Sequence, residues 1–228
     1  GTLGWYLVPA ELSDQPDNKQ MQADMKTGME LMTKACNMGH GEACDDLATV
    51  HEGDWGIPKD LGRAAALRNR SCKLGYATGC FLMAYMHFRG EGVPKNPENG
   101  IQALKRACDG GSSDECGEMG EILVFGKEGV PKDFDRGIKP LIRACEADDS
   151  WCEDVGKGYA EKNDPANALK YYEKGCTKDG TWGACHKGGL LYKEQGKKAD
   201  AERLWKFACE NGDGDDASCK ELGIPMKE

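Results

Sequence analysis

The sequence predicts an all-α fold in which a helical hairpin repeats along the chain. The first observation is that the twelve cysteines form six closely spaced pairs, each enclosing a short polar turn. The second is that the second cysteine of each pair recurs after 36, 36, 36, 33 and 34 residues. A repeat of this length built from two helices is typical of α-solenoids, in which each hairpin buries its apolar face against its neighbours.

The residues after each second cysteine predict one helix of every hairpin, which we name the A helix. The residue three positions later is mostly apolar, the residue four positions later is always Ala or Gly, and the residue seven positions later is usually large. This spacing is that of a buried stripe, and its small residue lets a neighbouring helix approach closely. We therefore expect each A helix to begin at the second cysteine, with His51 and His87 packed inside.

The residues before each first cysteine predict the partner, which we name the B helix. Small residues stand one and eight positions before that cysteine and are expected at helix crossings. In the B helix that precedes Cys145, Gly137 and Pro140 are expected to kink the helix or delay its start. Glycine and proline in the connectors should end the A helix, and a final Asp or Asn should cap the B helix. The connectors are Gly56–Asp60, Gly92–Asn96 and Gly129–Asp133.

The repeat register defines the expected domain organisation. Residues 1–21 form an N-terminal extension outside the repeats, residues 22–223 form one elongated repeat domain, and residues 224–228 form a tail. The segment from Cys219 to Gly223 begins an A helix that no B helix follows, which predicts a terminal half-repeat. The apolar stretch Gly4–Val8 is expected either to cap the first hairpin or to be the remainder of a removed segment.

At these residues the chain resembles the Sel1-like repeat family, which is related to the tetratricopeptide repeats. The features that carry the resemblance are Met83-Ala84 in an A helix, the connector Gly90–Asn96 and the B-helix ending Arg106–Cys108. With a cysteine pair in every repeat, the chain looks most like the secreted, cysteine-rich branch of that family. The resemblance implies a right-handed superhelix of α/α hairpins braced by one disulfide per repeat.

Twelve cysteines paired at short spacing indicate an oxidising compartment, so we expect a secreted or periplasmic protein. Zinc binding is disfavoured, because the sequence has no Cys-x-x-Cys and its four histidines do not accompany the cysteine pairs at the spacing of a zinc finger. The chain begins with Gly and has no apolar run long enough for a signal peptide or a membrane-spanning helix, as expected for a mature secreted protein. The expected disulfides are Cys36–Cys44, Cys72–Cys80, Cys108–Cys116, Cys145–Cys152, Cys176–Cys185 and Cys209–Cys219.

Charge and motifs argue against several functions. The net charge is −9 and the basic residues form no cluster, which disfavours a nucleic-acid partner. No Ser-x-x-Lys occurs, and the Lys-Thr-Gly box at Lys26–Gly28 falls in a B helix, so a serine β-lactamase site is not supported. We expect no cofactor, no metal and no catalytic residue. A basic residue two positions before the first cysteine is expected to form a solvated row: Lys34, Arg70, Arg106, Arg143 and Lys174.

The related tetratricopeptide repeats bind ligands on the concave face of their A helices, one, five, eight and nine positions after the second cysteine. The resemblance therefore implies a binding surface centred on Phe81, Tyr85 and Phe88. The alternative is that these aromatic side chains pack against the preceding hairpin. The residues expected at the rim of the surface are Arg89, Asp45, Glu52 and Glu121.

These expectations favour a non-catalytic scaffold, monomeric when free, that holds a peptide or a partner protein in a concave groove. Two alternatives come from the resemblance. Some cysteine-rich relatives are described as penicillin-binding or β-lactamase-like hydrolases, and some periplasmic relatives are immunity proteins that neutralise a secreted toxic effector. The sequence does not name the partner.

Overall fold

The structure is a computed structural model that describes residues 19–53, 57–212 and 216–224. The expectations for the N-terminal stretch and the last four residues lie outside these ranges. Every regular element within them is a helix, as predicted. The chain divides into two compact units, one ending at Glu115 and the other beginning at Cys116, and each is described by itself.

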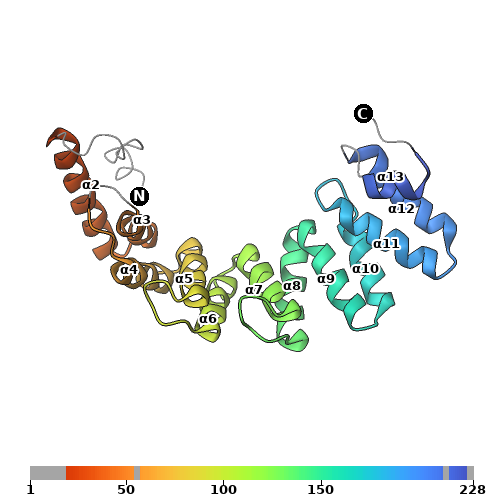
Figure 1. The fold of residues 1–228 in the computed structure, drawn as a ribbon, viewed down its shortest axis with the longest axis horizontal. Coiled ribbons are helices and arrows are strands. Elements are labelled where there is room, and N and C mark those ends of the chain that lie inside the picture. Colours follow the sequence, from red (N-terminus) through yellow and green to blue (C-terminus); the bar gives the residue numbers. More distant parts are fainter. Residues whose placement is uncertain (1–18, 54–56, 213–215, 225–228) are drawn as a thin grey trace. The chain divides into compact units, whose positions relative to one another are not determined.

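The first unit contains alternating B and A helices that pack on their neighbours in sequence (Figure 1). The A helices α3 and α5 also contact each other across α4. Its apolar contacts form small clusters between adjacent helices, such as Met25 and Met32 of α2 with Leu47 and Val50 of α3. The helices are α2 (Lys19–Asn37), α3 (Gly41–Glu52), α4 (Leu61–Lys73), α5 (Ala77–Arg89) and α6 (Pro97–Asp109).

The helix α7 (Ser113–Phe125) begins at the end of the first unit, and the rest of the chain repeats the hairpin pattern. The short α13 is the last helix in the described residues, which end at Ile224. The helices are α8 (Phe134–Ala147), the 3-10 helix η2 (Asp149–Trp151), α9 (Cys152–Glu161), α10 (Pro165–Gly175), α11 (Trp182–Glu194), α12 (Lys198–Asn211) and α13 (Asp216–Glu221).

The A helices begin earlier than predicted. Most of them start three residues before the second cysteine, so that this cysteine lies in the first turn; α3, for example, starts at Gly41 and contains Cys44. The exception is α9, which starts at Cys152 because η2 occupies the three preceding residues. Within each unit, the disulfides therefore connect the end of a B helix to the first turn of the following A helix.

The predicted helix caps are confirmed. The side-chain oxygens of Asp60, Asn96 and Asp133 accept hydrogen bonds from the backbone N–H three residues later, at 2.8, 3.1 and 3.0 Å. Of the two expectations for the B helix that contains Gly137 and Pro140, a kink or a late start, the late start is wrong, because α8 begins at Phe134 and includes both residues. The Asp133 cap fixes this start, which leaves Pro140 inside the helix.

The predicted helix crossings are also confirmed. A methyl group on Gly120 of α7 would lie 2.7 Å from the backbone nitrogen of Leu141 and 2.8 Å from the carbonyl oxygen of Gly137, both on α8. Backbone atoms cannot move aside as a flexible side chain can, so only glycine fits there.

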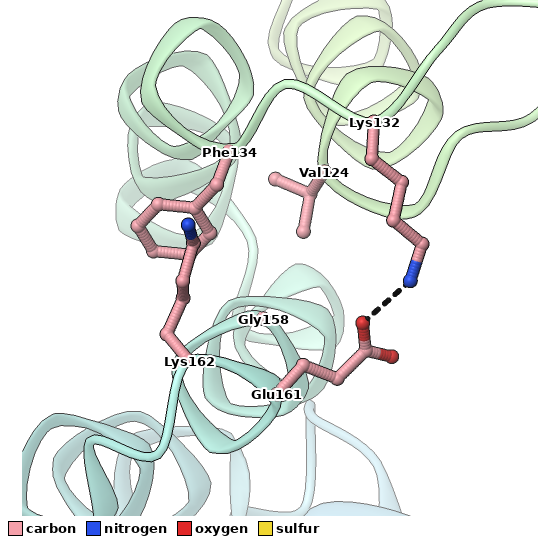
Figure 2. Close-up of a pocket in the computed structure, with 6 residues that line it drawn as sticks. All are labelled: Val124, Lys132, Phe134, Gly158, Glu161 and Lys162. Carbon is pink, nitrogen blue, oxygen red and sulfur yellow. Dashed lines mark hydrogen bonds and ion pairs between the residues drawn. The ribbon is translucent and has the colours of Figure 1, made fainter.

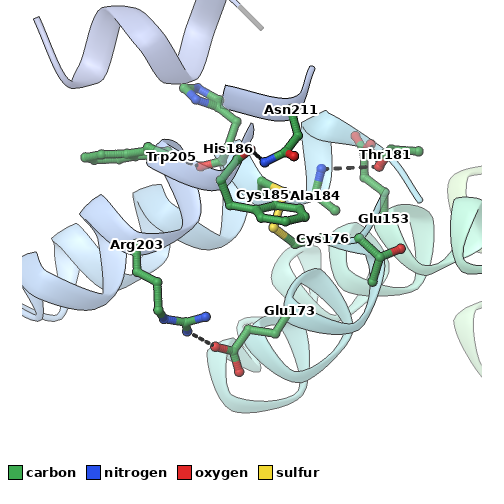
Figure 3. Close-up of a disulfide and its surroundings, with 12 residues drawn as sticks. Glu153, Glu173, Cys176, Thr181, Ala184, Cys185, His186, Arg203, Trp205 and Asn211 are labelled. Carbon is green, nitrogen blue, oxygen red and sulfur yellow. Dashed lines mark hydrogen bonds and ion pairs between the residues drawn. A yellow bond between two sulfur atoms is a disulfide. The ribbon is translucent and has the colours of Figure 1, made fainter. Parts of the chain in front are cut away.

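Five predicted disulfides are confirmed, with Cα–Cα distances from 4.4 to 5.0 Å; Figure 3 shows the Cys176–Cys185 bond between α10 and α11. Cys108 and Cys116 are disulfide-bonded as well, and no cysteine is free. In the predicted basic row the first four side chains are exposed, whereas Lys174 is half-buried and donates to the carbonyl oxygen of Cys145 at 2.8 Å.

Candidate binding groove

The first unit contains a groove of about 510 Å3 over α4, between α3 and α5. We name it the α4 groove. It includes three residues that the sequence predicted for the binding surface: Glu52, Tyr85 and Arg89. The full lining is Glu52, Lys59, Leu61, Arg68, Leu82, Tyr85, Met86, Arg89 and Glu91.

Arg68 forms the floor of the α4 groove and lies between two carboxylates. Its Nε atom is 3.5 Å from Oδ1 of Asp45, and its Nη1 atom contacts Oε1 of Glu52. Arg68 is 6% exposed and Asp45 is 7% exposed, so these two residues are almost completely withdrawn from water, whereas the Glu52 side chain stays 25% exposed. The prediction that Asp45 is a rim charge is therefore wrong, because Arg68 holds it beneath the groove.

An arginine at this position departs from the repeat pattern. It stands four residues before the first cysteine of its pair, where every other B helix carries a buried apolar or aromatic side chain. Those residues are Met32, Leu104, Leu141, Tyr172 and Trp205. Placing a charge in such a position costs desolvation energy, which the two carboxylates offset only in part. Comparison of this one position across the repeats would have identified Arg68 from the sequence.

The network is electrostatically strained. Burial raises the pKa of Asp45 to about 6, and the nearby Asp46 and Glu52 act in the same direction, although the Arg68 guanidinium opposes the shift. Among the described residues, neither Oδ1 of Asp45 nor Nε of Arg68 makes a hydrogen bond of normal geometry. A buried polar pair that is only partly satisfied contributes little to folding stability.

The predicted aromatic residues form a row along α5. The ring centroids of Phe81 and Tyr85 are 4.9 Å apart, and those of Tyr85 and Phe88 are 5.5 Å apart. The Arg89 guanidinium lies 5.2 Å from the Tyr85 ring centroid, which is a cation–π distance. Phe81 and Tyr85 are partly exposed, so these two rings are accessible to a ligand.

The prediction that Phe88 belongs to the exposed centre is wrong. Phe88 is 2% exposed and packs against α6, where a methyl group on Gly100 would lie 2.3 Å from the ring. Gly100 thus provides the space for the ring. For this residue the alternative reading, in which the aromatic side chain packs between helices, is confirmed.

Glu121, the last predicted rim residue, lies on α7 in the second unit. Its Oε1 atom pairs with Nζ of Lys127 at 2.5 Å. The α4 groove, by contrast, is built entirely from residues of the first unit.

The walls of the α4 groove carry exposed charges. Lys59 and Arg89 are exposed cations, and neither has a carboxylate partner in the part of the chain that the structure describes. Leu61 and Leu82 provide partly exposed apolar surface between them, above the buried Met86. The groove can therefore contact both apolar and acidic side chains of a ligand.

Other candidate sites have structural explanations. In the Lys-Thr-Gly box, Gly28 is buried in α2 and the Thr27 hydroxyl donates to the carbonyl oxygen of Ala23 in the same helix at 2.9 Å. His51 is buried as predicted, and burial lowers its pKa. In residues 19–53, 57–212 and 216–224, no three His, Cys, Asp or Glu side chains are grouped to hold a metal ion, and no helix could cross a membrane.

Comparison with solved structures supports the repeat architecture. A Sel1 repeat protein from Oxalobacter formigenes is 19% identical, with a TM-score of 0.66 over 86% of this chain and 82% of that chain. A protective antigen from uropathogenic Escherichia coli with an SLR fold is 17% identical, with a TM-score of 0.64 over 90% and 46%. The TPR protein YrrB, described as having an unusual peptide-binding site, is 16% identical, with a TM-score of 0.52 over 86% and 100%.

Sequence comparison identifies the family directly, although a search of curated proteins found no significant match. A model of the Sel1 repeat matches residues 19–40, 41–76, 77–112, 116–149 and 151–180, which make up more than half of the chain. The chain belongs to the Sel1 repeat family.

Proposed function

We propose that this protein is a non-catalytic interaction scaffold that holds an extended segment of a partner protein in the α4 groove. The observation that carries the proposal is Arg68, a charged residue at a position where the other B helices use apolar packing. A repeat scaffold gains no evident stability from an arginine in place of an apolar residue. A role in binding therefore accounts for Arg68 better than a role in folding.

The surface chemistry of the α4 groove supports a peptide ligand. Tyr85 and Phe81 offer large contact areas with little conformational entropy to lose, which is typical of residues that dominate binding energy. Lys59 and Arg89 favour a segment that carries a carboxylate beside an apolar side chain. The likeness to YrrB is consistent with this use of a helical-repeat surface, although it establishes the fold alone.

The disulfides support an extracytoplasmic location. All the cysteines are disulfide-bonded. Disulfides persist in the periplasm and outside the cell but are rare in the reducing cytosol. We therefore place the protein, as part of this proposal, in the periplasm or among secreted proteins.

The experiment is selection of a random peptide library on the immobilised, oxidised protein, followed by affinity measurement for the enriched peptides. We expect Tyr85→Ala to weaken binding by about 2 kcal/mol while the thermal unfolding midpoint stays nearly unchanged. Phe81→Ala should have a smaller effect in the same direction. Tyr192→Ala, which truncates a partly exposed tyrosine of the second unit, is the matched control.

Phe88→Ala separates binding from packing. Because Phe88 is buried against Gly100, its truncation should lower the free energy of unfolding by about 3 to 5 kcal/mol. Enriched peptides that bind Tyr85→Ala and Phe81→Ala as tightly as the unmodified protein would refute the α4 groove as the binding site.

A further inference from the structure

The second unit contains a smaller hollow of about 240 Å3, which we name the α9 hollow. Figure 2 shows Val124 of α7 and Phe134 of α8 around it, with Gly158 of α9 beneath them. Lys132, Glu161 and Lys162 complete the lining. Its volume is below that of usual drug-sized sites and suits a single side chain.

The α9 hollow exists because Gly158 departs from the repeat pattern. Gly158 stands six residues after the second cysteine, where the other described A helices that extend this far carry a large apolar side chain. Those residues are Val50, Met86, Ile122 and Leu191. A methyl group on Gly158 would lie 3.0 Å from Cγ1 of Val124 and 3.5 Å from Cε2 of Phe134, so the space directly adjoins two apolar side chains.

Helix stability does not account for Gly158. Glycine inside a helix is less favourable than alanine. Of the two apolar side chains beside Gly158, Val124 is 4% exposed and Phe134 stays partly exposed toward the hollow. The backbone of α9 at this point is regular helix and does not require glycine. The absence of a side chain is therefore better explained by what it leaves room for.

The mouth of the hollow carries a net positive charge. Nζ of Lys132 pairs with Oε2 of Glu161 at 2.9 Å, which neutralises both groups on one side (Figure 2). On the other side, Nζ of Lys162 lies 5.1 Å from the Phe134 ring centroid. Lys162 has no carboxylate partner within the residues that the structure describes. An incoming carboxylate can therefore pair with Lys162.

We propose that the α9 hollow is a second binding site, which accepts one apolar side chain of a partner polypeptide whose adjacent carboxylate pairs with Lys162. The apolar chain takes the place that Met86 or Ile122 fills within the other hairpins. The site does not depend on the α4 groove, since all of its lining residues belong to the second unit.

The experiment is an amide NMR titration of the full, oxidised chain with short acetylated peptides. Ac-Gly-Leu-Asp-Gly-NH2 and Ac-Gly-Gly-Leu with a free carboxyl terminus offer the carboxylate from a side chain and from a chain end. At least one of them should shift the amides of Val124, Phe134, Gly158 and Lys162. Replacing Leu by Ala should weaken binding at least about tenfold, and replacing Asp by Asn about three- to fivefold.

Two substitutions test the assignment to this hollow. Gly158→Met should fill the space and abolish the shifts at Phe134, whereas Lys139→Met, on the exposed face of α8, should leave them unchanged. Gly158→Ala, which adds only one methyl group, serves if the larger side chain disturbs folding. Lys162→Gln should weaken the binding of both carboxylate peptides about three- to fivefold. It should leave the affinity of the neutral peptide, in which Asn replaces Asp, unchanged.

The proposal is overturned if no peptide shifts these amides, if leucine and alanine peptides bind equally, or if folded Gly158→Met binds like the unmodified protein. Equal affinities of the Asp and Asn peptides would overturn the role of Lys162.

Discussion

The α4 groove and the α9 hollow occupy equivalent places in two hairpins and share a connector lysine, Lys59 or Lys132, yet they differ at the helix positions that form them. Aligned on the cysteines, Arg68 in the first unit corresponds to Leu141 in the second, and Glu52 corresponds to Val124. The first unit has gained charge in its core, and the second has kept an apolar core but lost a side chain at Gly158. Both sites thus arise where a repeat gives up a packing residue.

The second unit also shows how the same hairpin packs without the three charges of Asp45, Glu52 and Arg68. Asp45 corresponds to Gly117, and the space over Gly117 is filled by Trp151, whose ring atoms lie 2.4 Å from where a methyl group would be. In the first unit the residue equivalent to Trp151 is Gly79. The two arrangements are alternative ways to pack the same hairpin, so exchanging parts of one for the other tests the comparison.

The largest effect is expected from placing the arginine of the first unit in the second. Leu141 is fully buried among apolar side chains that include Val124, Cys145 and Val155, and no carboxylate takes the place of Asp45 or Glu52 there. Leu141→Arg should therefore lower the free energy of unfolding by about 4 kcal/mol or more. Urea denaturation measures this loss, and Leu141→Met, expected to cost less than about 1.5 kcal/mol, is the control.

The reverse exchange places leucine at Arg68 in the first unit. It should lower stability strongly by itself and only slightly when both carboxylates are removed as well. Arg68→Leu leaves Asp45 buried without its counter-ion and should cost about 3 kcal/mol at pH 7. The triple substitution Asp45→Ala, Glu52→Val and Arg68→Leu removes all three charges and should return stability to within about 1 kcal/mol of the unmodified protein. A triple variant as unstable as Arg68→Leu alone would mean that the ion-pair network is mainly structural.

The pH dependence of stability should reveal Asp45. Because burial raises its folded-state pKa to about 6 from an ordinary value of 3.8, the folded state binds the proton more tightly than the unfolded state does. Its contribution to stability therefore rises as pH falls from 7 to 4, by about 2 kcal/mol. Asp45→Asn should lack this rise. Parallel stability curves for the two proteins across this pH range would contradict the assignment.

The smallest effect is expected at Gly158. Gly158→Ala should raise the free energy of unfolding by about 0.5 to 1 kcal/mol, since alanine favours helix and Val124 need move only slightly to admit the methyl group. Thermal unfolding of the two proteins measures the difference. A clear loss of stability would mean that α9 requires glycine for packing, which would remove the argument for a vacant site.

The sequence predicted the local features of the fold correctly because they depend on neighbours in the chain. The helix caps at Asp60, Asn96 and Asp133 follow from residue type and position, and the disulfides follow from cysteine spacing. The starts of the A helices other than α9 were missed, because these helices begin three residues before the second cysteine. Only α9 starts at its cysteine as predicted, since a 3-10 turn occupies the three residues before Cys152.

The candidate site was predicted only in part. Tyr85, Arg89 and Glu52 line the α4 groove as the family resemblance implied, but Phe88 turned out to be buried. The depth of Phe88 depends on Gly100, a residue on the next helix, so positions along α5 alone could not reveal it. Arg68 and Gly158 were both detectable, because each is an exception within a column of aligned repeats.

The most direct test of the α4 groove is to map where a selected peptide binds on the unmodified protein. In an amide NMR titration with the tightest peptide from the library, we expect the largest shifts at Glu52, Arg68, Tyr85 and Arg89. The triple variant that lacks Asp45, Glu52 and Arg68 should remain folded and bind at least about tenfold more weakly. Shifts confined to the second unit, or equal affinity of the triple variant, would contradict the account.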